Sequence, residues 1–412
     1  MISDAFLQVA QSIGDRLCRD SVWDGDYCYW IDDAMEYEGN DWSVVSGPVT
    51  ADLYSGASGI ALFLARLHTV SPDQAYHRTA TGALEYALSR YQTLDASASN
   101  GLYGGWTGIA YALSTAADAL GNERFTHEAL QIITDRRDDD PALQALDIVF
   151  GSAGAIPALL AINEKHPSRV IIDLACRYGE YLLATANEHD NEHDQGWSWS
   201  TLGTASTDIL GFSHGAAGIG WALLELARAT NDSRFETGAE QAFAYERQHF
   251  DPDEANWPDL RDDVGPAERF PVAWCHGAPG IGLSRLRAYE LTKREDYLQE
   301  AEAAIRTTTQ WLSRPSDKKN YSLCHGIGGN ADLLIYAGQV LANRDLTNVA
   351  HERATEGVER YASGEEPWPC GTYWGGESLG LMQGLSGIGY FYLRLIDPIK
   401  VPPVTIIRPN YS

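Results

Sequence analysis

A glycine pair followed by an apolar stretch recurs seven times in this chain and restricts the folds open to it. In each copy two glycines stand three residues apart, and successive copies begin 46 to 64 residues apart. Each interval is long enough for a helix, a loop and a second helix. Self-similarity on this scale is typical of repeat architectures. The copies begin at Gly56–Gly59, Gly105–Gly108, Gly151–Gly154, Gly215–Gly218, Gly277–Gly280, Gly326–Gly329 and Gly384–Gly387.

Two kinds of helix are predicted to alternate. Segments that follow the glycines, such as GIALFLA and GIGWALL, are apolar nearly all round, as expected of helices buried on every side. Segments between them, such as THEALQIITD and REDYLQEAEAAIRTTTQWL, carry apolar residues at helical spacing and have one polar face. No comparable set of alternating strands appears. Seven such pairs that close on themselves predict an all-α fold, an α/α toroid (a double helical barrel) of seven inner and seven outer helices.

The predicted toroid covers residues 51–407, with residues 1–50 as an N-terminal helical lead-in, so that 1–412 form one domain. Glycine explains the architecture in two ways. It accepts a positive φ where the chain turns sharply, and a pair of glycines lets neighbouring helix ends approach closely at the narrow end of a ring. Neither property accounts for any chemistry.

Composition excludes several classes of function. The formal net charge is −27, which disfavours binding to a nucleic-acid backbone. The longest uncharged apolar run, Ile148 to Ile162, is shorter than the roughly 18 residues that suggest a membrane span. The N-terminus has no basic region typical of a signal peptide. Six cysteines in 412 residues do not form a disulfide framework. We therefore expect a cytoplasmic protein with no transmembrane segment, which could belong to a membrane-associated complex.

Three of the seven glycine turns carry polar residues. They read Ser213-His214-Gly215, Trp274-Cys275-His276-Gly277 and Leu323-Cys324-His325-Gly326. Repeat symmetry places these residues at equivalent corners of the ring, so two cysteines and three histidines gather at one mouth of the central cavity. Thiolate and imidazole are the ligands that zinc prefers. The sequence therefore predicts a zinc site.

The spacing leaves the ligand set open. Three protein ligands would leave the fourth tetrahedral position free, which is typical of a catalytic site. Two Cys–His pairs, with His276 included, would give a closed site of four ligands. A different histidine pair, His189 and His193, has the spacing of a zinc metalloprotease motif. Asp190 replaces the glutamate after the first histidine there, and the polar segment is predicted to be a solvated loop.

Longer motifs resemble a known family. SHGAAGIG, WCHGAPGIGLSRL, SLCHGIGGNADLL and LMQGLSGIGYFYLRL are similar, in this order, to signatures of the lanthionine synthetase C-like (LanC-like) cyclases. The likeness is closest to the C-terminal cyclase domain of class II lanthipeptide synthetases (LanM). It extends from about Asp52 to Ile407, and the ending VPPVTII also resembles that of the family. A chain of 412 residues has no room for the dehydratase domain of a class II synthetase, so we expect either a free-standing cyclase or an excised domain. A free-standing cyclase would need a separate dehydratase.

The resemblance implies roles for individual residues. It implies one zinc ion per chain, bound by Cys275, Cys324 and His325, with His276 outside the coordination sphere. It implies that His214 is the acid/base residue and that Asp147 is a further catalytic candidate, for which a helix cap or a surface acid is the other interpretation. The expected substrate is a dehydrated precursor peptide with a leader and a core. The expected reaction adds its cysteine thiols to dehydroalanine or dehydrobutyrine and forms (methyl)lanthionine rings.

Three other functions compete with the cyclase. An enzyme of this fold could add glutathione or another small thiol to proteins that contain dehydroamino acids, and its site would be identical. The chain could also be an inactive scaffold for a partner dehydratase, although its intact Cys–Cys–His set argues against this. An α/α-barrel glycosidase would need two opposed carboxylates, and no repeat turn carries such a pair.

Overall fold

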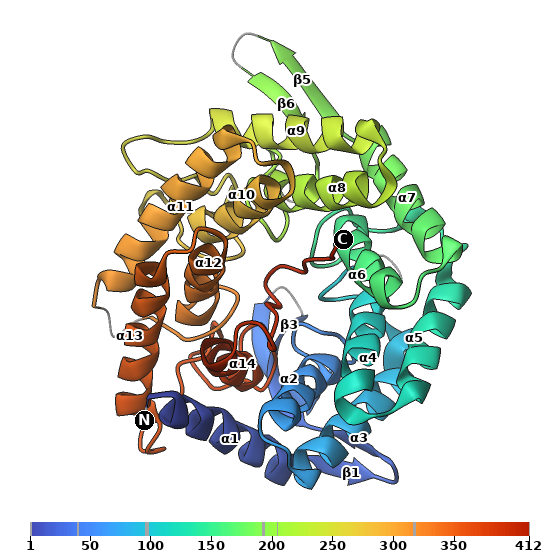
Figure 1. The fold of residues 1–412 in the computed structure, drawn as a ribbon, viewed down its shortest axis with the longest axis vertical. Helices are drawn as coiled ribbons and strands as arrows, with labels where there is room; N and C mark the ends of the chain where they lie inside the picture. The colour runs from blue at the N-terminus through green and yellow to red at the C-terminus, as the bar shows by residue number, and fades with distance from the viewer. Residues whose placement is uncertain are drawn as a thin grey trace.

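The computed structural model describes residues 2–38, 41–94, 99–191, 194–203, 205–315 and 319–411. Within these ranges fourteen α-helices form two concentric rings, so the fold is the predicted α/α toroid (Figure 1). Each inner helix packs against the inner helices of the neighbouring repeats, and α14 packs against α2 to close the ring. The inner helices are α2 (Ala57–Val70), α4 (Trp106–Leu120), α6 (Ser152–Lys165), α8 (Ala216–Thr230), α10 (Ala278–Thr292), α12 (Ile327–Val340) and α14 (Leu385–Ile396).

The outer ring corrects the predicted boundary of the toroid. Six outer helices follow their inner partners in sequence, but α14 is paired with α1, the first helix of the chain. Phe6 of α1 is buried and its ring lies edge-on to Tyr392 of α14, with centroids 5.4 Å apart. Helix α1 is therefore the seventh outer helix and not a lead-in. The outer helices are α1 (Ile2–Asp20), α3 (Gln74–Arg90), α5 (Glu123–Arg136), α7 (Arg169–Ala184), α9 (Ser233–Gln248), α11 (Glu295–Ser313) and α13 (Arg344–Tyr361).

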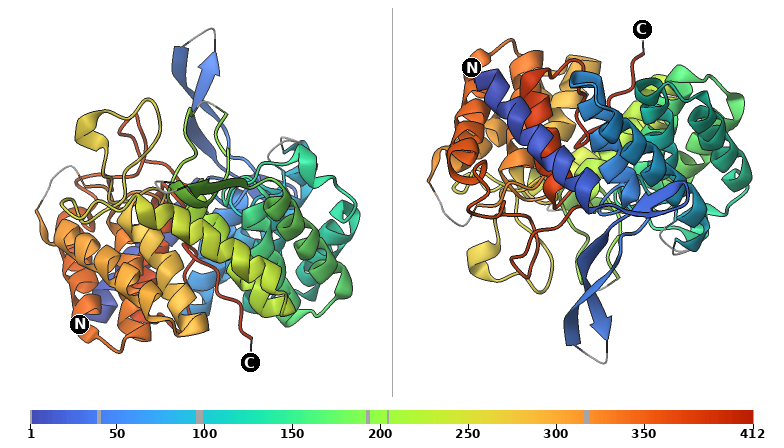
Figure 2. Two further views of the ribbon diagram at one scale, coloured as in Figure 1. Left: turned by 90° about the horizontal axis from the view of Figure 1, so that it is seen from above. Right: turned by 90° about the horizontal axis from the view of Figure 1, so that it is seen from below.

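Residues 22–48 were predicted to be helical, and this was wrong. They form two antiparallel hairpins, and a third joins the outer helix α7 to the loop before α8. Figure 2 shows the hairpin of β3 and β4 projecting from the face opposite the C-terminus. The strands are β1 (Val22–Asp24), β2 (Tyr27–Tyr29), β3 (Ile31–Glu38), β4 (Asp41–Pro48), β5 (Asn187–Asn191) and β6 (Asp194–Ser198), and short 3-10 turns cover Tyr91–Thr93, Pro141–Leu143 and Pro266–Glu268.

The segment of the second histidine pair is a hairpin and not a solvated loop. His189 lies in β5, and its Nε2 is 2.7 Å from Oγ of Ser198 in β6. His193 lies outside the described residues. The polar run is therefore accommodated by cross-strand pairing, in which each strand satisfies the backbone groups of the other.

The repeat glycines allow backbone segments to approach each other closely, and most of the first glycines do not have a left-handed backbone. The first glycine of each pair caps its inner helix with an extended backbone in six of seven copies, and only Gly277 has a positive φ, of 87°. A Cβ on the second glycine would lie within 2.3 Å of a carbonyl oxygen of the preceding turn in every copy; at Gly108 the distance is 1.8 Å, to Leu102. No larger residue fits there.

Backbone hydrogen bonds connect the seven glycine turns into a closed belt. Each turn donates at least one amide to the carbonyl of a neighbouring turn, and the last such bond returns to the first turn. The belt fixes the mutual positions of side chains that are far apart in sequence. Its bonds are Leu53 N to Tyr103 O, Tyr103 N to Val149 O, Ile148 N to Ser213 O, Ser213 N to Cys275 O, Cys275 N to Cys324 O, Cys324 N to Met382 O and Met382 N to Tyr54 O, all between 2.8 and 3.3 Å.

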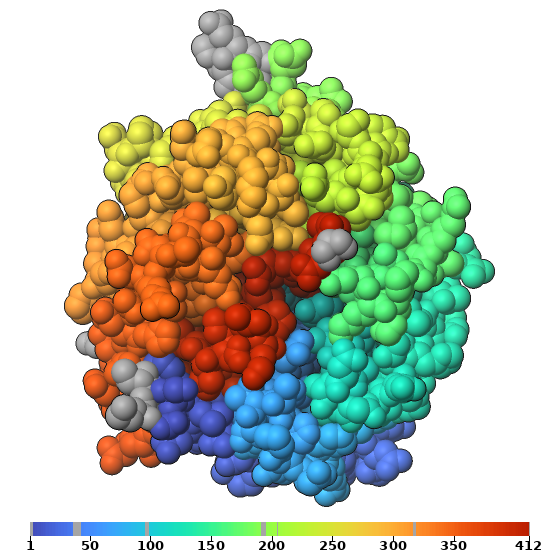
Figure 3. All heavy atoms as spheres, viewed as in Figure 1, coloured from blue at the N-terminus to red at the C-terminus, as the bar shows by residue number. Residues whose placement is uncertain are grey.

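The C-terminal segment fills the centre of the ring (Figures 1 and 3). Tyr103 Oη donates to Val404 O at 2.6 Å, and Trp274 Nε1 donates to Thr405 O at 2.8 Å. Both partners come from inner-ring turns, and the side chain of Thr405 is fully buried. The centre of the toroid is therefore packed and not open. We call the segment that follows α14, residues 397–411, the plug. No helix within the described ranges is both long and apolar enough to cross a membrane.

A buried ion pair holds this plug, and removing its cation should destabilise the fold. Arg394 of α14 donates to Asp332 of α12 at 2.9 Å, and both side chains are almost fully buried. We expect Arg394→Met to lower the free energy of unfolding by about 3–5 kcal/mol, because Asp332 would keep a buried charge without its counter-charge. Chemical denaturation measures this. Arg360→Met, which removes an exposed pair with Glu366, is the control and should cost about 1 kcal/mol or less.

Candidate metal and acid–base site

Two neighbouring turns of the belt bring three zinc-type ligands together. Cys275 precedes α10, and Cys324 and His325 precede α12. One ligand atom from each of the three lies within 4.8 Å of the others. Two sulfurs and one imidazole nitrogen at this separation fit a tetrahedral zinc ion with one position left over. The structure thus brings together the three residues proposed as ligands.

The two sulfurs lie too close to be anionic together without a cation. The hydrogen bond with Cys324, together with burial, raises the pKa of Cys275 well above its usual value. The same hydrogen bond lowers the pKa of Cys324. The pair alone therefore favours a single negative charge. A divalent ion between them would allow both to be thiolates, because a coordinated thiol loses its proton.

Tyr54, from the first glycine turn, supports this cluster and was missed by the sequence analysis. Its Oη donates to Cys324 Sγ at 3.0 Å. Burial and the neighbouring Cys324 sulfur raise the pKa of Tyr54 well above its ordinary value, so the phenol keeps the proton that it donates. Nothing in the local sequence around Tyr54 signals this contact, since it depends on closure of the ring between the last repeat and the first.

His276 is not part of the Cys275–Cys324–His325 group and has other neighbours. Its ring lies 6.2 Å from that of His214, and its Nδ1 is 4.0 Å from Asp259 Oδ2. Only 6% of the residue is exposed, and burial lowers the pKa of His276 to about 4, which favours a neutral imidazole. Within the described chain the candidate ligand set contains three residues and does not include His276.

His214 and Asp147 form a hydrogen-bonded pair. His214 Nδ1 is 2.6 Å from Asp147 Oδ2, and Asp147 Oδ1 accepts a hydrogen bond from Phe150 N at 2.7 Å. The Asp147 side chain is 2% exposed, so it is not a surface acid. It does cap its own turn, as the other interpretation held, but its second oxygen orients the imidazole. Because Asp147 occupies Nδ1, Nε2 is the nitrogen of His214 left for a substrate.

One cavity of about 660 Å³ contains both parts of the site. The metal cluster and His214 line it together with apolar residues, including Phe150 and the exposed Tyr373. It also contains Asp259 and Arg261, which come from a long loop outside the glycine repeats. These residues could not be found from repeat symmetry. An apolar cavity with a few convergent polar groups has the character of a substrate site.

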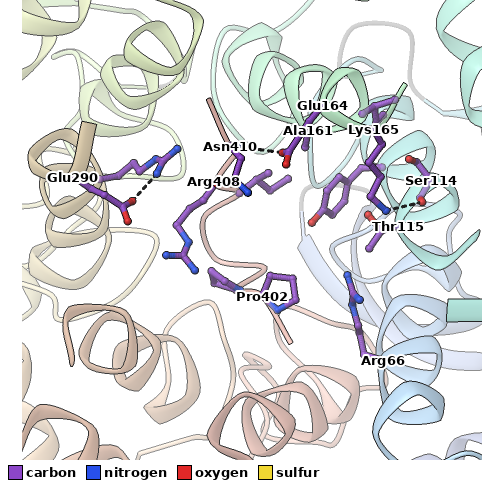
Figure 4. Close-up of a pocket in the computed structure, with 15 residues that line it drawn as sticks. Arg66, Ser114, Thr115, Ala161, Glu164, Lys165, Glu290, Pro402, Arg408 and Asn410 are labelled. Atoms are coloured by element: carbon purple, nitrogen blue, oxygen red, sulfur yellow. Dashed lines mark hydrogen bonds and ion pairs between the residues drawn. The ribbon is translucent and has the colours of Figure 1, made fainter. Parts of the chain in front are cut away.

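A second cavity, of about 360 Å³, contains none of the residues proposed from sequence (Figure 4). Its polar groups hold the C-terminal segment against the inner helices. Asn410 N donates to Glu164 at 3.0 Å, and Arg287 donates to Pro409 O at 2.7 Å. This cavity therefore belongs to the anchoring of the plug.

The loop before α14 leaves room for His325 only because position 371 is glycine. A Cβ on Gly371 would lie 2.9 Å from Cε1 and Nε2 of His325 and 2.7 Å from Ser322 Oγ. We expect Gly371→Ala to displace the imidazole and to weaken zinc binding about 10- to 100-fold, as the loss of a supporting residue does at other metal sites. Competition with a chromophoric chelator measures the affinity. Gly265→Ala, where a Cβ meets nothing within 4 Å, is the matched control. Equal affinity in both variants would contradict the prediction.

Comparisons with known proteins agree with this arrangement. Residues 47–406 match the family model described as lanthionine synthetase C-like protein. The chain is 25% identical to the glutathione S-transferase LANCL1 of Danio rerio over 289 residues, which cover 68% of this chain and 67% of that one. It is 23% identical to the nisin biosynthesis protein NisC of Lactococcus lactis subsp. lactis over 369 residues, which cover 81% and 83%. Among solved structures, nisin cyclase superposes with a TM-score of 0.63 at 19% identity and covers 85% of this chain and 90% of its own, which supports the toroidal fold.

Proposed function

Because the chain belongs to the lanthionine synthetase C-like family, we propose that it is a zinc-dependent lanthipeptide cyclase. The observation that carries the proposal is the shared cavity, which is lined by Cys275, Cys324 and His325 together with His214, whose Nδ1 is paired with Asp147. Its substrate would be a precursor peptide whose serines and threonines have been dehydrated by a separate activity. The product would be a peptide with thioether rings.

The donor set suits the proposed metal. Zinc held by Cys275, Cys324 and His325 would take the peptide thiol at its remaining position and favour the thiolate, which is the nucleophile. Two protein thiolates already balance the charge of the ion, so the peptide sulfur should stay nucleophilic.

The other steps belong to residues of the chain. His214 Nε2 accepts the proton of the thiol and returns a proton to the α-carbon after the sulfur has bonded to the β-carbon, since an imidazole exchanges protons near neutral pH. Asp147 orients the ring through Nδ1 and stabilises its charged form. The apolar walls of the cavity limit access of water to the intermediate.

One relative favours a second function. The similarity to a protein named as a glutathione S-transferase supports an enzyme that adds a small thiol to dehydroamino acids. The same residues would perform that reaction, because only the source of the thiol differs. The size of the cavity is compatible with either thiol.

The test is incubation of the zinc-loaded protein with a dehydrated, uncyclised precursor, with and without glutathione. Alkylation followed by mass spectrometry counts the remaining thiols. We expect loss of peptide thiols with no change in peptide mass before alkylation, because cyclisation is an isomerisation. Addition of the mass of glutathione would support the second function. Binding of the peptide with neither reaction, across several precursors, would indicate a scaffold for a partner dehydratase.

A further inference from the structure

The loop between α9 and α10 places the cationic side chain of Arg261 at the wall of the cavity that contains the candidate metal ligands and His214. This loop covers residues 249–277, and Trp257 anchors it in the core. Among the described residues that line the cavity, Arg261 is the only lysine or arginine. Its position is notable in a chain whose net charge is −27. The two described carboxylates that line the cavity are engaged, since Asp52 accepts the amides of Ser55 and Gly56 and Asp259 accepts hydrogen bonds from Arg261 itself.

The segment around Arg261 is held by contacts before and after this residue. Arg261 Nε and Nη2 donate to the two oxygens of Asp259 at 3.0 to 3.1 Å and 2.6 Å. Asp259 is almost fully buried, and its amide donates to Arg269 O at 2.7 Å. On the other side, Asp262 accepts hydrogen bonds from the amide and hydroxyl of Ser206 at 2.9 and 2.6 Å. The loop is thereby fixed before and after Arg261.

His276 links Arg261 to the residue proposed to transfer the proton. Its ring lies 6.2 Å from that of His214, and its Nδ1 is 4.0 Å from the Asp259 carboxylate that holds Arg261. Nη1 of Arg261 has no partner among the described residues. A planar guanidinium with a free N–H edge is suited to an oxyanion.

We propose that Arg261 stabilises the enolate oxygen formed during addition, an inference that rests on the proposed function. As the thiolate sulfur bonds to the β-carbon, the π electrons of the alkene shift toward the carbonyl and leave negative charge on its oxygen. Arg261 donates hydrogen bonds to that oxygen. Protonation of the α-carbon by the His214 imidazolium then restores the carbonyl. The α-carbon and the oxygen belong to one dehydroamino acid, so the proton donor and the oxyanion donor must both reach that residue in a single cavity.

The experiment compares Arg261→Met with Arg269→Met in the zinc-loaded protein. Arg269 is on the same loop but does not line the cavity. We expect Arg261→Met to lower kcat about 10²- to 10³-fold, as the loss of an oxyanion donor does, with KM little changed. The kcat of Arg269→Met should stay within about twofold of the wild-type value, because this substitution alters no group at the reacting atoms. Arg261→Lys keeps the positive charge but loses the planar guanidinium, so its kcat should lie between those of wild type and Arg261→Met.

Two further readouts separate the roles that Arg261 could have. Zinc per chain should equal that of wild type, and fluorescence anisotropy should give an unchanged Kd for a dehydrated peptide whose cysteine is replaced by alanine. A raised KM and Kd with unchanged kcat would mean that Arg261 only binds the ground state, and this would overturn the proposal. Full activity of both Arg261 variants would overturn it and leave the cyclase assignment intact. A wild-type protein that adds no thiol at all would refute both.

Discussion

Alanine at Cys324 or at Cys275 is expected to remove the metal and the cyclase activity together. Each substitution takes one of the three proposed ligands from a site that would also need two thiolates to balance a divalent ion. Loss of a supporting residue costs about 10- to 100-fold in metal affinity, and loss of a ligand should cost more. We therefore expect zinc to fall from one per chain to well below one, and turnover of a dehydrated precursor to fall at least about 10³-fold.

Zinc content measured by atomic emission after gel filtration checks the first part of this prediction, and thiol counting checks the second. Cys176→Ala is the matched control, because Cys176 lies on the outer helix α7. His276→Ala should keep its zinc. Loss of zinc from the His276 variant would reinstate the closed site of four ligands, and retention of one zinc in both ligand variants would exclude the proposed site.

The second large effect concerns proton transfer. His214→Asn is expected to lower kcat about 10²- to 10⁴-fold while zinc stays at one per chain, because the imidazole is proposed to move protons and is not among the clustered candidate ligands. Single-turnover kinetics with a dehydrated precursor, together with zinc analysis of the same sample, measure this. A variant with one zinc and wild-type turnover would show that another group transfers the proton.

Asp147→Asn tests the orienting role separately. Asparagine keeps an oxygen that can accept the hydrogen bond from Phe150 N, so the turn before α6 should persist. If the amide nitrogen faces His214 Nδ1, two donors meet and the imidazole is misoriented. If the amide oxygen faces it, the hydrogen bond remains but the negative charge that stabilises the imidazolium is lost. We expect about 10²- to 10⁴-fold lower kcat with little change in Tm, by analogy with other carboxylate–histidine pairs. If Tm falls markedly while kcat is preserved, Asp147 is a structural cap only.

Local periodicity predicted the inner ring well, because each inner helix is announced by its glycine pair and by apolar residues on all sides. It did not reveal that α1 is the seventh outer helix. Helix α1 has an ordinary amphipathic pattern, and its partner α14 begins at Leu385. Pairing between the two ends of a chain leaves no signal in a window of neighbouring residues. The hairpins were missed because strand β3 (IDDAMEYE) lacks a regular alternation of apolar and polar residues.

The candidate site was predictable where it follows repeat symmetry. The turns of His214, Cys275 and Cys324 occupy equivalent places, and the belt of backbone hydrogen bonds fixes them as neighbours. Tyr54 and Arg261 were not predictable in this way. Tyr54 reaches Cys324 across the closure of the ring, and Arg261 comes from a loop whose conformation depends on the buried Asp259.

The packing of α1 against α14 has a consequence for how the protein folds during synthesis. During synthesis on the ribosome, helix α1 emerges before its partner α14. Its apolar face therefore stays exposed to solvent while the intervening helices are synthesised. Only when the last inner helix follows can the two ends meet, and until then both flanks of an open arc present apolar helix surface to solvent. Assembly of the intact circle is therefore a late and non-local event, of the kind that folds slowly and is prone to misassociation. Because the belt passes through the turns of Cys324 and Met382 to reach Tyr54, the candidate metal site can acquire its final shape only at that moment.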